Sequence, residues 1–347
     1  MSELVIERVD PFDDDAFDAW YDVMTASWLD VRGPDADLWA REEQRVELQQ
    51  QTEKTDRRAY VGRVGGEAVA AAWMAMPLLD NLHRATLVVA VLPDDRRQGH
   101  GTGLLDHVEA EARAQGRTSL TGEVWWPWSL GSGGEGSPGR DFGIARGYAP
   151  ALVEVRRLLR LPVPDDVLDR LAAEAAEKHG DYTLRSWVGR VPDDIVESWA
   201  VLDASLETEA PTGDLDIEAL EPDVAKVRET EELVAAQKRT LYHSVALDAG
   251  GRVVAYTVIG YSSLDGNSYQ WGTLVEGAHR GHRLGLAVKV ANLRLLQSER
   301  PEVPTLATYN AEVNAHMIQV NEAMGFEPVE WLCSIQKQRS DVGTPRR

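Results

Sequence analysis

The sequence predicts an α/β fold that occurs twice in tandem, and three observations lead to this interpretation. The chain has 347 residues, too many for one ordinary domain and suited to two of roughly 150–180 residues each. Short apolar runs typical of strands alternate with segments of helical periodicity. Several features also recur in the same order at an offset of about 180 residues, which indicates two copies of one fold.

The first repeated features are a helix start and a hairpin. "RVDPFDDDAFDAW" at 8–20 resembles "GRVPDDIVESWAVL" at 189–202, because each has a strand end, a Pro/Asp turn that can cap a helix, and a helical stretch. "GRVGGEAVAAAW" at 62–73 parallels "LDAGGRVVAYTV" at 247–258, and both predict two strands joined by a Gly-Gly turn. Each copy is therefore expected to begin with a strand, a helix and a β-hairpin.

A buried strand and a helix come next in each copy. Residues 85–92 form a nearly continuous apolar run, as a buried strand does, and residues 104–115 have helical periodicity with Gly116 as a stop. The second copy has the matching strand at 269–275 and the matching helix at 286–297. A further strand, helix and strand complete each copy.

The endings of the copies set the expected domain bounds. "IARGYAP" at 144–150 parallels "AMGFEPV" at 323–329. Between the copies, a segment that starts with prolines and then has helical periodicity predicts a structured linker. We expect an N-terminal domain over 1–160, a helical linker over 161–181 and a C-terminal domain over 182–347.

Composition limits the classes of partner. The chain carries 57 acidic against 36 basic residues, a net charge of −21, which argues against nucleic acid. An acidic surface can attract amines, or it can serve solubility alone. Cys333 is the single cysteine, so no disulfide framework is expected and a reducing, cytoplasmic location is predicted. No signal peptide or membrane span is predicted, and the expected assembly is a monomer or homodimer.

A basic, glycine-rich loop joins a strand to a helix in each copy. The loops read "PDDRRQGHGTGLL" at 93–105 and "GAHRGHRLGLAVK" at 277–289. The first amides of a helix have no intrahelical partner, and the helix dipole is positive at that end. Glycines let the backbone curl so that several N–H groups converge on one anion. The loops therefore predict a phosphate or pyrophosphate site, although neither matches a Walker loop or a dinucleotide fingerprint.

The loops and the C-terminal ending carry a family resemblance. "RRQGHG" at 96–101 resembles the cofactor loop of the GNAT superfamily of acyl-CoA-dependent N-acetyltransferases. "RGHRLG" at 280–285 is similar, except that Arg283 stands where the first glycine is usual, and "NAEVNAHMIQVNEAMGF" at 310–326 is similar to the family's ending. The tandem layout resembles the mycothiol synthase group. The resemblance implies, for each copy, a mixed and mostly antiparallel sheet with helices on both faces, splayed at the acyl-CoA site.

The resemblance also implies where acetyl-CoA, the expected co-substrate, would bind. Loop amides would hold its pyrophosphate, strand ends would pair with its pantetheine arm, and asparagines of the second copy would touch it. The residues in the first copy are Val89, Val91, Arg96, Arg97, Gln98, Gly99, His100, Gly101, Thr102 and Gly103. Those in the second copy are Thr273, Leu274, Val275, Arg280, Gly281, His282, Arg283, Leu284, Gly285, Asn310 and Asn314. His279 and His282 lack further ligands nearby in the sequence, so no metal site is predicted.

The implied reaction is direct attack of an amine on the thioester, which needs a base, an oxyanion donor and an acid for the thiolate. The family's usual acid is a tyrosine, but its position holds Asn321 here, and Gly143 in the first copy. Tyr309 is a candidate substitute, or the thiolate leaves without help. Glu123 and Glu276 are the candidate bases.

The sequence thus predicts an N-acetyltransferase that modifies the primary amine of a small polar molecule. The alternative is a non-catalytic protein that binds acyl-CoA or has a regulatory role. We expect the C-terminal copy to be catalytic, because it has the asparagine pair Asn310 and Asn314. Arg283 either turns its side chain outward or fills the cradle. "WWPW" at 125–128 is either core or an aromatic wall of an acceptor pocket shared between the domains.

Overall fold

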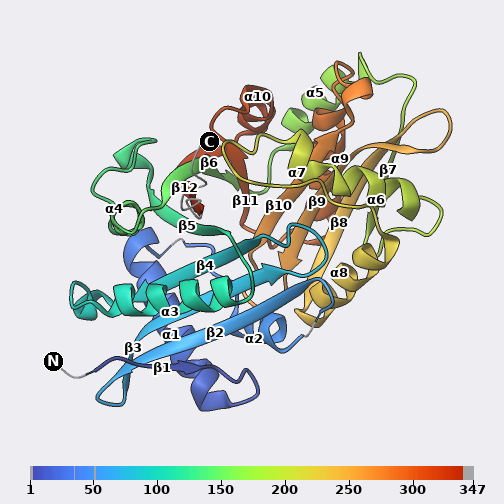
Figure 1. Cartoon of the computed structure of the whole chain (residues 1–347). Coiled ribbons are helices and arrows are strands. Elements are labelled where there is room, and N and C mark those ends of the chain that lie inside the picture. The colour runs from blue at the N-terminus through green and yellow to red at the C-terminus, as the bar shows by residue number, and fades with distance from the viewer. Residues whose placement is uncertain (1–2, 35, 51, 339–347) are drawn as a thin grey trace, which may run out of the picture.

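The computed structural model describes residues 3–34, 36–50 and 52–338 (Figure 1). The N-terminal copy consists of β1 (Val5–Arg8), α1 (Asp14–Arg32), α2 (Arg41–Gln49), β2 (Thr55–Val64), β3 (Glu67–Pro77), β4 (Arg84–Val91), α3 (His100–Ala114), β5 (Ser119–Pro127), α4 (Pro138–Ala145) and β6 (Ala149–Arg160). The linker forms α5 (Asp165–Ala176). The strand expected at 85–92 is β4, and the helix expected at 104–115 lies in α3, which begins four residues earlier because the glycine-rich loop supplies its first turn.

The C-terminal copy repeats this order. It consists of β7 (Thr183–Val188), α6 (Val196–Ala204), α7 (Leu206–Glu209), α8 (Val224–Ala236), β8 (Arg239–Leu247), β9 (Val253–Ser262), β10 (Ser268–Val275), α9 (Leu284–Glu299), β11 (Thr305–Ala311), α10 (Ala315–Met324) and β12 (Glu327–Gln338). The prediction of two copies of one α/β fold is confirmed.

All strands of both copies join in one sheet. Its order is β1-β2-β3-β4-β5-β12-β6-β11-β10-β9-β8-β7. Neighbouring strands are antiparallel except for β4 with β5 and β10 with β11, which are parallel. The prediction of a mixed, mostly antiparallel sheet is therefore confirmed.

The last strand of each copy lies against the other copy, as the centre of Figure 1 shows. β12 inserts between β5 and β6 and pairs with β5 from Glu330↔Pro127 to Gln338↔Ser119. β6 in turn pairs with β11 from Thr305↔Arg160 to Ala311↔Glu154. The sheet thus runs without a break from one copy into the other, and the domain bounds 1–160, 161–181 and 182–347 stay a prediction.

Helices cover both faces of the sheet, because alternate residues of a strand point to opposite faces. In β3, Ala71 packs in one cluster with Trp20 of α1, whereas Ala70 and Ala72 pack in another with Leu104 of α3. Figure 1 shows α3 in front of β3 and β4, with α1 behind them. The face under α1 is the one on which the cavity described below opens.

The C-terminal copy is covered in the same way. Tyr256 of β9 packs with Trp199 of α6, and its neighbour Ala255 packs with Val288 of α9 on the opposite face. The linker helix α5 lies against α9 and buries Leu168 and Leu171 there. Because α5 covers the side of α9 that faces away from the sheet, α9 is buried on nearly all sides. Its largely apolar sequence, "LGLAVKVANLRLL", agrees with this position.

A buried ion pair joins α2 of the first copy to β8 of the second. Arg239 donates from Nε and Nη2 to the two carboxylate oxygens of Glu43 at 2.7 and 2.8 Å, and both side chains are fully buried. The guanidinium also lies 3.9 Å from the centre of the Trp39 ring. Bidentate geometry and stacking make this the best-ordered polar contact between the copies.

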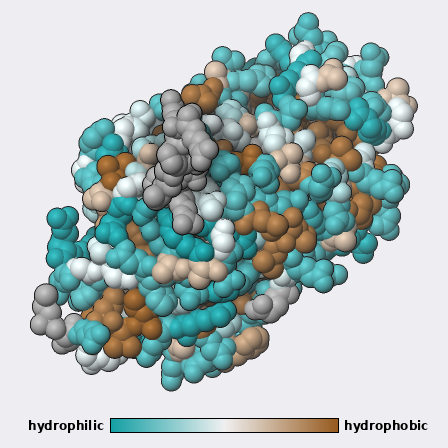
Figure 2. Space-filling view, in the orientation of Figure 1, coloured by the Kyte–Doolittle hydropathy of each residue, from teal (hydrophilic) through white to brown (hydrophobic). Residues whose placement is uncertain are grey.

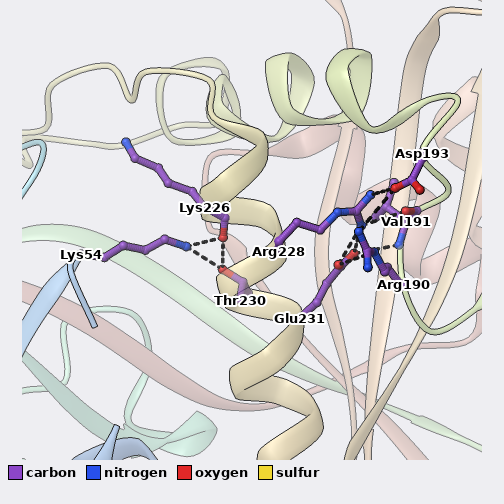
Figure 3. A network of polar contacts seen from close by, with 8 residues as sticks. All are labelled: Lys54, Arg190, Val191, Asp193, Lys226, Arg228, Thr230 and Glu231. Carbon is purple, nitrogen blue, oxygen red and sulfur yellow. Dashed lines mark hydrogen bonds and ion pairs between the residues drawn. The ribbon is translucent and has the colours of Figure 1, made fainter. Parts of the chain in front are cut away.

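A second polar contact ties the copies together at α8 (Figure 3). Lys54 of the first copy donates to the carbonyl of Lys226 and to Thr230 Oγ1, the latter at 2.9 Å. On the far side of α8, Arg228 contacts Asp193 at 2.6 Å and Glu231 at 2.8 Å. These contacts position α8 between the N-terminal copy and the segment that leads into α6.

Figure 2 shows a face dominated by hydrophilic residues, with separate small apolar patches. Among the helices that the structure describes, none is both long enough and apolar enough to cross a bilayer.

Prediction for the buried ion pair. Glu43→Ala leaves the Arg239 guanidinium buried without its partner, and this is expected to lower the free energy of unfolding by about 3–5 kcal/mol. The matched control is Asp193→Ala, which removes a partner of Arg228. The Asp193 side chain is 84% exposed, so its loss is expected to lower the free energy of unfolding by less than about 1 kcal/mol. Urea unfolding followed by circular dichroism measures both. Equal losses in the two variants would contradict the role given to this pair.

Candidate active site

The two glycine-rich loops have the same backbone path. Each contains two residues in the left-handed region, Arg97 (φ 65°) and Gly99 (φ 93°) in the first and Gly281 (φ 86°) and Arg283 (φ 55°) in the second. Each loop thus has one glycine and one arginine at these positions, in opposite order. A side chain in this region costs about 1 kcal/mol, so Arg283 is tolerated without a change of path.

The first arginine of each loop anchors it in the same way. Its Nε donates to the carbonyl of the last residue of the preceding strand, and a terminal nitrogen contacts a carboxylate at the end of a helix. The contacts are Arg96 with Val91 (3.1 Å) and Asp30 (2.6 Å), and Arg280 with Val275 (3.4 Å) and Glu209 (2.6 Å). Both arginines are therefore held at the strand ends, and the amides that follow them are left to bind an anion.

Those amides belong to the starts of α3 and α9, where the predicted cradle residues lie. The first N–H groups of a helix have no intrahelical partner, which suits a diphosphate. Space differs between the copies: a Cβ on Gly101 would lie 3.3 Å from Val91 Cγ2, whereas one on Gly285 would lie 3.7 Å from Val275 Cγ2. The remaining cradle residues line the same turns, namely Gln98, His100, Thr102 and Gly103 in the first copy and His282 and Leu284 in the second.

The linker and the first residue of the C-terminal copy contact the side chains of the second loop. Tyr182 Oη lies 2.9 Å from His279 Nδ1, and Arg283 Nη1 lies 2.9 Å from Glu174 Oε1. His282 Nδ1 lies 3.2 Å from the carbonyl of Lys178. Of the two readings for Arg283, the structure shows the outward one, with its guanidinium directed to α5. Within the residues that the structure describes, no group of three or more His, Cys, Asp or Glu side chains could hold a metal.

In each copy the two parallel strands pair only at one end and then separate. β4 pairs with β5 from Arg84↔Ser119 to Thr86↔Thr121, and β10 pairs with β11 only at Tyr269↔Ala307 and Gln270↔Thr308. The predicted pantetheine-binding residues lie in or beside the unpaired parts and bond only to the preceding strand. They are Val89 and Val91, which pair with Ala72 and Ala70, and Thr273, Leu274 and Val275, which pair with Thr257, Tyr256 and Ala255.

Glu123 and Tyr309 occupy equivalent positions where these strands separate. In both β5 and β11 a fully buried leucine, Leu120 or Leu306, precedes the residue in question by three positions. The pairings across β12 and β6 place both side chains on the same face of the sheet. The structure therefore brings together one predicted base and the predicted acid, from different copies.

Both side chains line a cavity of about 340 Å³ that residues of both copies enclose. Val88 and Glu123 border it on the two sides of the β4–β5 separation. Nine aromatic residues line it: Trp20, Tyr21, Trp28, Trp39, Trp73, Trp125, Tyr269, Trp271 and Tyr309. Of the "WWPW" run, Trp125 lines this wall, Trp126 is core at 2% exposure, and Trp128 stacks on Trp331 at the surface. The interpretation as core therefore fits Trp126, and the interpretation as a pocket wall fits Trp125.

Glu123 is a carboxylate without a partner, and its side chain is exposed at the largely aromatic cavity. No residue that the structure describes donates a hydrogen bond to it, and desolvation by the surrounding protein raises its pKa although the charge of Arg32 opposes the shift. Glu154 of β6 lies on the same face, and burial, followed by the charge of Glu123, raises its pKa to about 7. The charge of Glu123 therefore disfavours the ionisation of Glu154.

Tyr309 is held in a polar network instead. Its hydroxyl donates to Asp37 Oδ2 at 2.8 Å and accepts from Arg32 Nη2 at 3.2 Å. Burial, followed by the charge of Asp37, raises its pKa far above the ordinary value for a phenol. Arg32 and Arg156 also contact Glu330 of β12. A phenol that holds its proton so firmly suits a structural donor better than a general acid.

The other predicted catalytic and asparagine residues lie outside the cavity. Glu276 pairs with Arg252 at 2.8 Å on the outer side of the second loop. Asn321 is fully buried and donates to Asn310 Oδ1. Asn314 caps α10 by accepting from the amide of Met317 at 3.2 Å. The hydrogen bond between Asn321 and Asn310 holds α10 against β11.

Sequence reasoning missed Glu154 and the contribution of the second copy to the cavity wall. Glu154 stands in "ALVEVRRLL", a strand whose charged residues fall at positions that a central strand buries. That pattern was a usable signal, because a buried charge in a strand needs a partner or a function. Trp271 had no such signal, since its place in the wall depends on the contact between the copies.

Comparisons with known proteins agree with this architecture. Residues 17–124 match the acetyltransferase (GNAT) family. A tandem GNAT protein from the clavulanic acid biosynthesis pathway is 28% identical over 98% of this chain and 100% of its own, with a TM-score of 0.76. A GCN5-related N-acetyltransferase from Sphaerobacter thermophilus (16% identity, 97% and 96% coverage, TM-score 0.64) and Saccharomyces cerevisiae N-myristoyltransferase (10%, 97% and 80%, 0.56) share the fold. No curated protein sequence matches the chain significantly.

Prediction for the coupled carboxylates. The pKa of Glu154 is about 7 in the folded chain, above its ordinary 4.5, so the unfolded chain loses this proton first and the fold loses stability as the pH rises from about 4.5 to about 7. Glu154→Gln removes this cost and is expected to raise the free energy of unfolding by about 2 kcal/mol at pH 8.5. At pH 5 the carboxyl is protonated, and little gain is expected. Urea unfolding at both pH values measures the difference; the same gain at both would contradict a titrating Glu154.

Proposed function

We propose that this chain transfers an acetyl group from acetyl-CoA to the primary amine of a small molecule, because residues 17–124 match the GNAT acetyltransferase family and a tandem GNAT protein is similar over 98% of the chain. We place the reaction in the N-terminal copy, between β4 and β5. The family consists of acyltransferases; the acceptor, the acetyl donor and the reacting copy are the parts proposed here. The cytoplasmic location and the monomeric or dimeric state stay predictions from the sequence.

One observation carries the proposal: Glu123 lies unpaired at the point where β4 and β5 separate, in a cavity large enough for a small acceptor. Its raised pKa makes it a stronger base than an exposed carboxylate. The charge of Glu123 in turn helps to raise the pKa of Glu154, since nearby carboxylates resist carrying two negative charges.

In this proposal, the residues of the chain have the following roles in binding and proton transfer. The amides from Gly99 to Gly103 would bind the diphosphate, and the free edge of Val89–Val91 would pair with the pantetheine arm. The amine nitrogen attacks the thioester carbonyl carbon, so that a C–N bond forms and the C–S bond breaks. Glu123 takes the proton that the nitrogen loses, and the thiolate then takes up one proton to leave as the free thiol. The family's usual tyrosine acid is not needed if the carboxyl of Glu123 returns that proton.

The C-terminal copy supports this chemistry less well, contrary to the expectation from its asparagine pair. It has Tyr309 in the position of Glu123, and that hydroxyl is bonded to Asp37 and Arg32. Asn310 and Asn321 bond to each other. The linker also contacts its loop through Glu174. We propose that this copy completes the cavity of the first.

The second candidate function is a non-catalytic protein that binds acyl-CoA. It is favoured by the residues at the usual acid position, because Asn321 is engaged and Gly143 has no side chain. Release of free CoA from acetyl-CoA in the presence of a panel of primary amines distinguishes the two. Binding of acetyl-CoA without turnover of any amine would favour the second.

Prediction for the base. Glu123→Gln is expected to lower kcat/KM by about 10²- to 10⁴-fold, because the amide cannot accept the proton, while acetyl-CoA binding stays unchanged. In the unmodified protein kcat/KM should rise with pH as Glu123 loses its proton, at a pH above the ordinary range of a glutamate because its pKa is raised. Glu276→Gln is the matched control, and a comparable loss in that variant would shift the base to the other copy.

Prediction for the cradles. Gly101→Val is expected to abolish acetyl-CoA binding measured by calorimetry, because even its Cβ would press on Val91. Gly285→Val, the matching change in the other loop, has more room and is expected to leave one strong site. Loss of turnover in Gly285→Val but not in Gly101→Val would assign the reaction to the C-terminal copy.

A further inference from the structure

The cavity walls are more apolar than a polar acceptor would require. Aromatic rings from both copies form most of their surface, although Arg32, Asp37, Gln44, Glu47, Glu123 and Gln270 also line them. At the end next to Glu123 the walls are Trp28, Trp73 and Trp125, and at the far end they are Trp39 and Trp271. Sugar hydroxyls buried against such walls would lose their hydrogen bonds to water without replacement, which costs binding free energy.

The same walls already hold cations. The guanidinium of Arg239 lies 3.9 Å from the centre of the Trp39 ring and 5.8 Å from that of Trp271. The guanidinium of Arg32 lies 5.1 Å from the centre of the Trp125 ring. Aromatic faces attract positive charge, and the attraction grows where water is excluded. These rings therefore favour a cationic neighbour over an anionic one.

Only one carboxylate of the cavity lacks a cationic partner among the residues that the structure describes. Asp37 contacts Arg32 and Arg156, and Glu47 contacts Arg57 at 3.0 Å. Glu123 has no such contact. The cavity thus combines one unmatched negative charge with an apolar interior, so a ligand that complements it has one positive charge and an apolar body.

From this arrangement we infer that the acceptor is a primary amine on an aromatic or alkyl body, bound with its nitrogen at Glu123 and its body between the tryptophans of the two copies. This inference rests on the proposed function and replaces the polar acceptor that the sequence suggested. Polyamines fit less well, because a second ammonium would meet no second free carboxylate. Amino sugars fit less well because of their hydroxyls.

The inference also makes Trp271 a specificity residue, although it belongs to the C-terminal copy. It extends the far wall of a cavity whose reacting end belongs to the N-terminal copy. Its removal should weaken binding of the apolar body and leave the cofactor loop of the first copy untouched. Trp128 offers a matched control, because it is 40% exposed and lies outside the cavity.

The experiment compares phenethylamine and hexylamine with spermidine and glucosamine, using the full chain. CoA release gives kcat/KM, and quenching of tryptophan fluorescence gives binding without turnover. We expect the first pair to have kcat/KM values at least about tenfold higher. Trp271→Ala should raise the KM for phenethylamine about tenfold with kcat nearly unchanged, and Trp128→Ala should change neither.

The outcomes separate the two claims. Faster turnover of spermidine or glucosamine than of phenethylamine overturns the inference and leaves the proposed function standing. Binding of phenethylamine that Trp271→Ala weakens, without turnover of any amine, supports the cavity's ligand class and overturns the proposed function. Faster turnover with decanoyl-CoA than with acetyl-CoA would assign the cavity to an acyl chain and overturn the inference.

Discussion

The exchange of the last strands is the constraint on which the rest of the structure depends. β12 takes its place beside β5, and β6 takes its place beside β11, so neither copy completes its sheet from its own residues. This places Glu154, Leu332 and Tyr309 on the face that Glu123 occupies. The cavity, the coupled carboxylates and the network around Arg32 all follow from the exchange. Two copies in contact without strand exchange would have none of these three features.

The shared sheet also lets the copies diverge. Both retain the loop path and the arginine anchor at the preceding strand, since these are local features of a strand, a turn and a helix. At the strand separation they differ, with a free carboxylate in one copy and a bonded phenol in the other. The phenol helps to hold Arg32 and Asp37 at the cavity wall. One copy can therefore provide the reacting group while the other provides part of the cavity wall around it.

How much the sequence predicts depends on the range of the interaction. The two loops and the repeated element order were predicted, because residues close in the chain determine them. The strand exchange was not, since β6 and β12 have the same alternation whichever strand they pair with. For the same reason Glu154 was missed, and Asn310 was given a cofactor role, although in the structure it accepts a hydrogen bond from Asn321. Trp125 was weighed correctly as a wall candidate, but Trp271 of the same wall could not be identified without the contact between the copies.

The acidity of the chain and the charge of the cavity act over different distances. The net charge of −21 is spread over a surface where salt screens interactions beyond about 8 Å, so it affects the approach of a cation more than its binding. Within the cavity, Asp37 and Glu47 are neutralised by arginines, and a single carboxylate remains to attract an ammonium. Because aromatic walls border this carboxylate, its charge is screened less than that of the open acidic surface. In the proposed function, Glu123 would thus select the charge of the acceptor, and the surrounding tryptophans would select its body.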